Sequence, residues 1–169
     1  VNVDAVGTIT VVDGQTGVSA VNGQVELDAT GINSNIAVND SVVTAAGNIN
    51  VLADNDVTFD ATSDITSTSG NVVVTADTDG AADGGGSDQG ALTMADGAVI
   101  NAGSGTVDMD ANEDVSVSIV TTSNTVDVTS AVGAIVDNTA AEAANVTGST
   151  LDLDAVTGIG SGATLDGAG

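Results

Sequence analysis

Seven phrases of one pattern recur along the chain, and their spacing limits the possible folds more than any other feature. Each phrase runs apolar, polar, apolar, polar, small. The copies are VNVDA from Val1, VELDA from Val25, INVLA from Ile49, VVVTA from Val72, VDMDA from Val107, VDVTS from Val126 and LDLDA from Leu151. Their starts are 24, 24, 23, 35, 19 and 25 residues apart. Alternation with period two inside each phrase predicts a short β-strand in every repeat.

Further short apolar stretches fall between the phrases. They begin at Ile36, Val57 and Val115, with a third kind at Ile65, so two or three strands fit each repeat. A glycine stands two positions before the phrase at Gly23, Gly47, Gly70 and Gly105, which marks a recurring corner. The sequence therefore predicts an all-β fold, a parallel β-helix of about seven coils of ~24 residues. A β-sandwich of the same short strands is the alternative.

The alternation also predicts which side chains face the core. Two inward columns are expected along the first strand of every coil, and their members are Val1, Val3, Val25, Leu27, Ile49, Val51, Val72, Val74, Val107, Met109, Val126, Val128, Leu151 and Leu153. We expect one solenoid domain over residues 1–169. The longest interval contains DTDGAADGGGSDQG, residues 77–90, which we interpret as an acidic, glycine-rich loop inserted between coils.

The charge excludes whole classes of partner. The chain has 24 acidic residues and no lysine, arginine or histidine, so its formal net charge is −24. Such a chain has no electrostatic attraction for nucleic acid or anionic lipid. Disorder is disfavoured because 41% of the residues are hydrophobic. No apolar run approaches the length of a membrane span, so membrane insertion is not expected.

Catalysis is not expected either. Without histidine or cysteine the chain has no imidazole base and no thiol nucleophile. Two carboxylates could serve a hydrolase of neutral sugars, but sugar grooves favour aromatic platforms and Phe59 is the only aromatic residue. We interpret Phe59 as a core residue and predict that the protein is not an enzyme.

Calcium is the one cofactor that the residues suggest, because carboxylates in a glycine-rich setting are the hard oxygen ligands this ion takes. The competing interpretation is a solvated acidic loop. One candidate set lies in the loop, and a second forms an outward ladder on the repeated phrase. The loop set is Asp77, Asp79, Asp83 and Asp88, and the ladder set is Asp4, Asp28, Asp110 and Asp154. A neighbouring outward column is expected to hold Asn2, Glu26, Asn50, Asp108, Asp127 and Asp152.

Residues 47–76, GNINVLADNDVTFDATSDITSTSGNVVVTA, resemble the repeats of filamentous-haemagglutinin-type exoproteins of bacteria. The matching features are Gly47-Asn48-Ile49, the step from Ala53 to Val57, and the return from Ile65 to Asn71. The resemblance covers about two coils well and the other five loosely. It implies a right-handed β-helix, secretion to the prokaryotic cell surface, and a role in adhesion or in building a filament.

Two functions of different classes are thus expected. The first is a structural extracellular fibre subunit or adhesin-stalk segment whose partners are copies of itself, stacked head to tail. In such a stack Leu151 would be followed by the next Val1 after 19 residues, a spacing already present between Val107 and Val126. The second is a calcium- or glycan-binding surface module that acts through residues 77–90, with cell-surface glycans as the partner.

Overall fold

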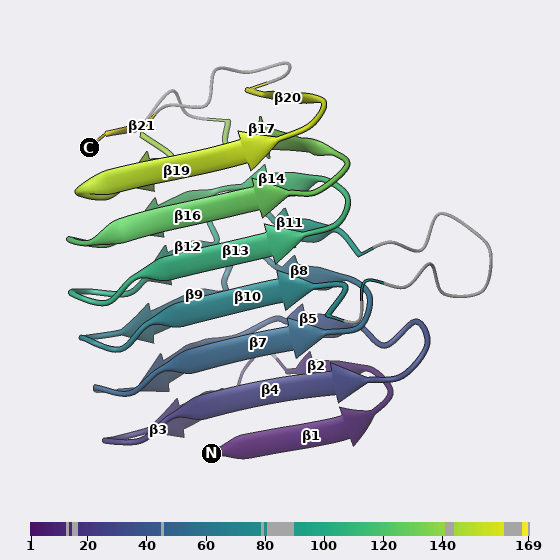
Figure 1. The fold of residues 1–169 in the computed structure, drawn as a ribbon. Helices are drawn as coiled ribbons and strands as arrows, with labels where there is room; N and C mark the ends of the chain where they lie inside the picture. Colours follow the sequence, from purple (N-terminus) through teal and green to yellow (C-terminus); the bar gives the residue numbers. More distant parts are fainter. Residues whose placement is uncertain are drawn as a thin grey trace.

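The protein is a three-sided parallel β-helix. The computed structural model describes residues 1–12, 14, 17–44, 46–78, 80, 90–140, 144–160 and 167–168, and no residue among them is helical. Consequently no helix in this part of the chain could cross a membrane. Three seven-stranded parallel sheets run the length of the molecule (Figure 1). The predicted β-solenoid is confirmed.

Successive strands enter sheets A, B and C in turn. Sheet A contains β1 (Asn2–Val6), β4 (Val25–Thr30), β7 (Ile49–Ala53), β10 (Val72–Ala76), β13 (Val107–Ala111), β16 (Thr125–Ser130) and β19 (Thr150–Ala155). Sheet B contains β2 (Ile9–Val11), β5 (Ile36–Val38), β8 (Val57–Phe59), β11 (Leu92–Met94), β14 (Val115–Val117), β17 (Ala134–Asp137) and β20 (Gly158–Ile159). Sheet C contains β3 (Val18–Ala20), β6 (Val42–Thr44), β9 (Asp64–Ser67), β12 (Val99–Asn101), β15 (Ile119–Thr121), β18 (Val146–Thr147) and β21 (Gly167–Ala168).

The winding is right-handed, and the two termini lie at opposite ends of the stack. In Figure 1 the strands of sheet A run from left to right at the front, and the chain turns behind at their right-hand ends as it climbs from N to C. This is the usual sense of a parallel crossover. Six complete turns separate β1 from β19, and β19, β20 and β21 add one further strand to each sheet, so about six turns give seven rungs, close to the expected count of about seven coils.

The register between coils is the one that the repeated phrase predicts. Val3 pairs with Leu27, and Leu27 pairs with Val51. The column continues through Val74, Met109, Val128 and Leu153. Each phrase therefore lies directly above the phrase one coil earlier, including across the 35-residue and 19-residue intervals.

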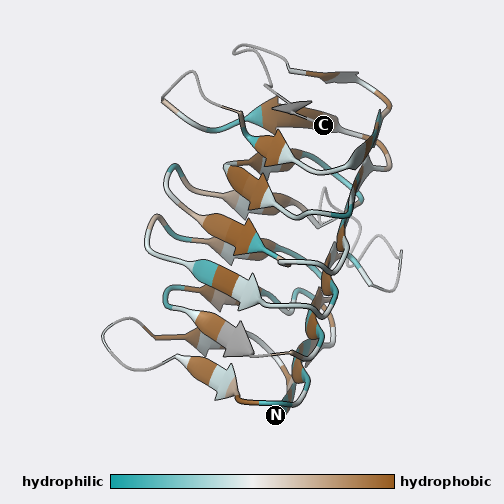
Figure 2. Cartoon of the chain, turned by 90° about the vertical axis from the view of Figure 1, so that its left-hand side faces the viewer, coloured by the Kyte–Doolittle hydropathy of each residue, from teal (hydrophilic) through white to brown (hydrophobic). Residues whose placement is uncertain are grey.

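The predicted inward columns form the core. From the second to the sixth coil their side chains are 0% exposed, whereas Val3, Leu151 and Leu153 in the terminal coils are only partly buried and Val1 is 55% exposed. In sheet B, Phe59 lies between Val38 and Met94 and is buried, as predicted. Hydrophobic residues coincide with the strands in coil after coil (Figure 2).

The Gly-Asn pairs sit at the corner where sheet C leads into sheet A. A Cβ on Gly47 would lie 1.8 Å from the carbonyl oxygen of Gly23, and one on Gly70 would lie 2.0 Å from that of Gly47. Only glycine allows the coils to approach so closely here. The side-chain oxygen of Asn48 accepts a hydrogen bond from the backbone N–H of Asn71 at 3.0 Å, so the asparagine ties its corner to the next coil.

The two ends of the segment 77–90 lie in a single coil. Strand β10 ends at Ala76 and β11 begins at Leu92, so the segment joins sheets A and B inside the fourth coil, whereas the sequence analysis placed it between coils. Its two ends meet, since a Cβ on Gly90 would lie 2.6 Å from the backbone nitrogen of Asp77. The strands on both sides of the segment keep the register of the ladder. Residues 79 and 81–89 lie outside the described part of the chain.

We predict that Val51→Asp unfolds the protein. Val51 is fully buried between Leu27 and Val74, so the substitution places an unpaired carboxylate in the core and should lower the free energy of unfolding by about 4 kcal/mol or more. The measurement is urea denaturation followed by circular dichroism. Asn50→Asp, which adds the same charge on the outward face of the same strand, is the control and should stay folded. Equal stability of the two variants would contradict the inward assignment.

Candidate functional site

The outward face of sheet A gathers acidic side chains into two groups. One outward column contains Asp4, Asp28, Leu52, Thr75, Asp110, Thr129 and Asp154. Asp4 and Asp28 are therefore direct neighbours, but Thr129 separates Asp110 from Asp154, and the uncharged strands β7 and β10 separate these from Asp28. The predicted ladder of four carboxylates is thus one close pair and two single residues in that column.

The neighbouring column adds most of the remaining charge. It contains Asn2, Glu26, Asn50, Val73, Asp108, Asp127 and Asp152. Asp108, Asp127 and Asp152 occupy three consecutive coils. The acidic groups consequently lie toward the two ends of the sheet, with the uncharged strands β7 and β10 between them.

Partial burial and, after it, the charge of neighbouring carboxylates raise the pKa values of three of these carboxyl groups. Partial burial, followed by repulsion from Asp110 and Asp127, raises the pKa of Asp108 above its ordinary value. Partial burial and the charge of Asp127 raise the pKa of Asp110 in the same way. At the other end, partial burial and the charges of Asp4, Glu26 and Asp54 raise the pKa of Asp28. When these carboxyl groups are ionised, they lower the stability of the folded state.

Carboxylates at the corners differ from those on the face of sheet A because they accept hydrogen bonds. Burial alone would raise the pKa of Asp60, but the hydroxyl and backbone N–H of Thr62, together with Ser63, donate to it and hold its pKa below the ordinary value. The pKa of Asp137 is lowered in the same way, because Thr139 and Asn145 donate hydrogen bonds to its carboxylate and outweigh the effect of burial. Sequence reasoning missed these residues. The D-x-T spacing in Asp60-Ala61-Thr62 and Asp137-Asn138-Thr139 is the signal that could have identified them.

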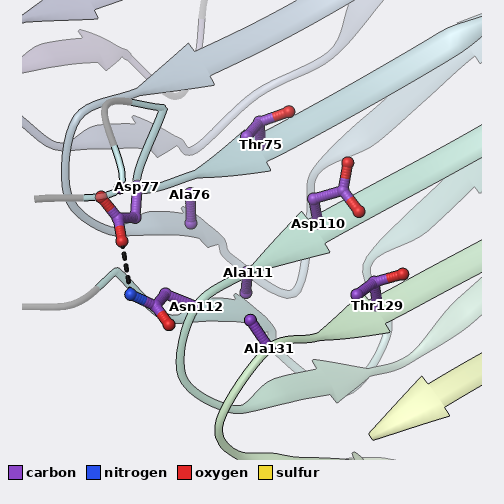
Figure 3. Close-up of a pocket in the computed structure, with 9 residues that line it drawn as sticks. Thr75, Ala76, Asp77, Asp110, Ala111, Asn112, Thr129 and Ala131 are labelled. Carbon is purple, nitrogen blue, oxygen red and sulfur yellow. Dashed lines mark hydrogen bonds between the residues drawn. The ribbon is translucent and has the colours of Figure 1, made fainter.

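A groove of about 390 Å³ lies where β10, β13 and β16 end (Figure 3). Its polar lining includes Thr75, Asp77, Asp110, Asn112 and Thr129. Asp77 is 9% exposed, and its Oδ2 accepts a hydrogen bond from Asn112 Nδ2 at 2.7 Å. Its Oδ1 is buried without a hydrogen-bond partner. The Asp77–Asn112 contact was also missed, although the register places these residues one position beyond paired strand ends.

Of the predicted calcium ligands in the described part of the chain, Asp77 and Asp110 line the groove. Figure 3 shows the Asp77 carboxylate at one edge, turned toward Asn112 and away from Asp110. Of the four loop candidates, Asp77 alone lies within the described residues, since Asp79, Asp83 and Asp88 fall outside them. Within the described part of the chain, no three acidic side chains come together in a way that could hold a metal ion. Calcium binding therefore stays a prediction.

Comparisons with protein-family models, with curated proteins and with solved structures gave no match. The resemblance of residues 47–76 to filamentous-haemagglutinin-type repeats therefore stays a prediction, and function has to be argued from the geometry of this chain.

The pKa shifts predict how stability depends on pH. A carboxyl group whose pKa is raised by folding stabilises the fold fully below its unfolded value, here 3.8, and loses that contribution as the pH rises through its folded pKa. At neutral pH and low salt, Asp108→Asn should therefore raise the melting temperature. One like-charge contact across a rung of ~4.8 Å costs about 0.9 kcal/mol in water, or roughly 2–4 °C. The gain should shrink as the pH falls toward 3.8.

The matched control is Asp60→Asn. Because the pKa of Asp60 is lowered by folding, its contribution is present above 3.8 and lost as the pH falls through the folded value, so this variant should melt at a lower temperature at neutral pH. Differential scanning calorimetry across the acidic range measures both. Destabilisation by Asp108→Asn at neutral pH would contradict the assignment of an unpaired acidic face.

Proposed function

We propose that this chain is a structural module of a bacterial cell surface, a fibre subunit or adhesin-stalk segment in which solenoids stack head to tail outside the cell. The observation that carries the proposal is where its exposed apolar side chains lie. Six of the nine large apolar side chains that are exposed among the described residues belong to the first coil or the last. They are Val1, Val6, Val12, Val21, Val156 and Ile159.

The middle of the molecule is nearly free of such side chains. Ile32 and Val132 lie in the coils next to the ends, and among the described residues Ile119 alone is central, at 38% exposed. Exposed apolar surface that is concentrated in one region marks an interaction site. Here it marks both ends of the stack, and this distribution favours association along the axis over lateral association.

The N-terminal end also has an open apolar mouth. A cavity of about 300 Å³ is lined by inward residues of the first coil, Val3, Ile9, Val11 and Val18, together with Leu27 of the second. In the second to fifth coils the equivalent side chains are buried between the coils on either side. A further coil placed on this end would close the mouth and pair the exposed edges of the parallel sheets.

The charge supports an extracellular setting. A net charge of −24 without a basic side chain opposes association at low ionic strength, while the screening length falls to about 3 Å in 1 M salt, shorter than a rung. A surface exposed to saline water tolerates this charge best. The absence of lysine and arginine also leaves no site for trypsin-like proteases, which suits a stalk exposed to them.

A calcium- or glycan-binding module acting through residues 77–90 is the second candidate. The observation in its favour is Asp77, whose buried Oδ1 has no hydrogen-bond partner. It ranks second because that carboxylate is turned away from Asp110, the other acidic residue of the groove (Figure 3).

Sedimentation velocity and negative-stain electron microscopy of the purified chain test the proposal. We expect filaments one solenoid wide in 1 M NaCl and dissociation at low salt. A solution that stays monomeric at high protein concentration in 1 M NaCl would overturn it. A comparison of NaCl with CaCl₂ at equal ionic strength separates the calcium alternative. Charge screening alone predicts filaments in both salts. A calcium-dependent module predicts a change in association only with CaCl₂.

A further inference from the structure

We propose that the joint between two copies has one fixed register, in which Val1–Ala5 of one copy lies opposite Leu151–Ala155 of the next, and that the acidic pair created by this register makes assembly depend on salt. The inference rests on the proposed head-to-tail stacking and adds the partner surface and its regulation. Three features of the terminal coils support it independently.

The first feature is the sheet-A ladder. Inside the molecule each repeated phrase stacks on the phrase below without a shift. Continued across the joint, the same pairing places Leu151 opposite Val1 and Leu153 opposite Val3. All four are incompletely buried in the single chain, so the contact would complete their burial. A slip by one residue would instead turn aspartates toward these apolar side chains.

The second feature is the corner that follows the last inward residue of each sheet-A strand. In the five inner coils this corner position is mostly polar. Its residues there are Thr30, Asp54, Asp77, Asn112 and Ala131. In the first and last coils it is Val6 and Val156, which are 91% and 72% exposed. The proposed register sets these two valines against each other, which gives both an apolar neighbour.

The third feature is sheet B. Ile9 lies as far along the chain from Val3 as Ile159 lies from Leu153. Ile9 pairs with Ile36 and Ile159 pairs with Ile135, so each belongs to the same inward column at its own end. Alignment in sheet A therefore aligns sheet B as well, and Ile159, 47% exposed, would cover Ile9.

The same register has an electrostatic consequence. It places Asp154 opposite Asp4, one rung apart, while Asp152 meets the neutral Asn2. Asp4 already has Asp28 on its other side. Two carboxylates at rung spacing weaken association about fourfold in water, and this effect disappears when the screening length falls below the rung. Salt therefore weakens the repulsion between Asp154 and Asp4 at the joint as well as the general repulsion between two acidic molecules.

Disulfide trapping tests the register. The chain has no cysteine, so Val6→Cys with Val156→Cys introduces one pair that can bridge copies only if these corners are neighbours. Oxidation in 1 M NaCl should give a ladder of covalent oligomers on non-reducing gels. The control pair, Val12→Cys with Val156→Cys, joins different corners and should stay largely monomeric. Filaments of wild-type protein with no ladder from the first pair would overturn the register and leave the proposed function standing.

Asp154→Asn tests the charge effect. It should strengthen association about fourfold at low salt, measured by sedimentation, and change little in 1 M NaCl. Asp64→Asn, which removes the same charge from an exposed position in the middle of sheet C, is the control and should have a smaller effect at both salt concentrations. Equal effects of the two variants at low salt would overturn the local pair, and an absence of wild-type filaments at any salt concentration would overturn the proposed function itself.

Discussion

The stacking of each residue on its equivalent one coil earlier is the interaction on which the whole molecule depends. In a parallel ladder each position recurs at every rung, so a side chain has to be compatible with the side chains at the equivalent position in the coils above and below. Apolar columns are stabilised by this repetition, because Leu27, Val51 and Val74 bury one another in the core. Glycine corners permit it where the coils approach most closely. The acidic face of sheet A is where the same repetition acts against the fold.

The chain accommodates its carboxylates in two ways. At the corners, a carboxylate accepts backbone or hydroxyl hydrogen bonds, which take the place of the absent cations: Asp60 and Asp137 do so within their own turns, while Asp56 accepts from the N–H of Ala91 in the next coil. On the outward face of sheet A, the backbone donors are already used by the ladder. Partial burial and then the like charges nearby therefore raise the pKa values of Asp108 and Asp110. Stability and assembly of this protein are therefore both functions of ionic strength.

Much of the fold could be predicted because one physical signal, apolar alternation within a repeat, determines both the strands and their register. The same spacing that aligned Val3, Leu27 and Val51 in the sequence aligns them in the ladder. The corner between sheets A and B has no such repeated signal. The sequence could not place the 77–90 segment inside a coil, because that depends on Asp77 and Gly90 meeting in space. The interruption of the acidic column by Leu52 and Thr75, in contrast, is visible in the sequence, because these residues hold the fourth position of the phrases from Ile49 and Val72.

The central claim is that the axial ladder continues from one molecule into the next, and X-ray diffraction from oriented filaments tests it most directly. Seven rungs per molecule with no gap at the joint predict a sharp meridional reflection at about 4.8 Å together with an axial repeat of about 34 Å. A repeat clearly longer than seven rungs, or strands that do not run perpendicular to the filament axis, would contradict continuous head-to-tail stacking.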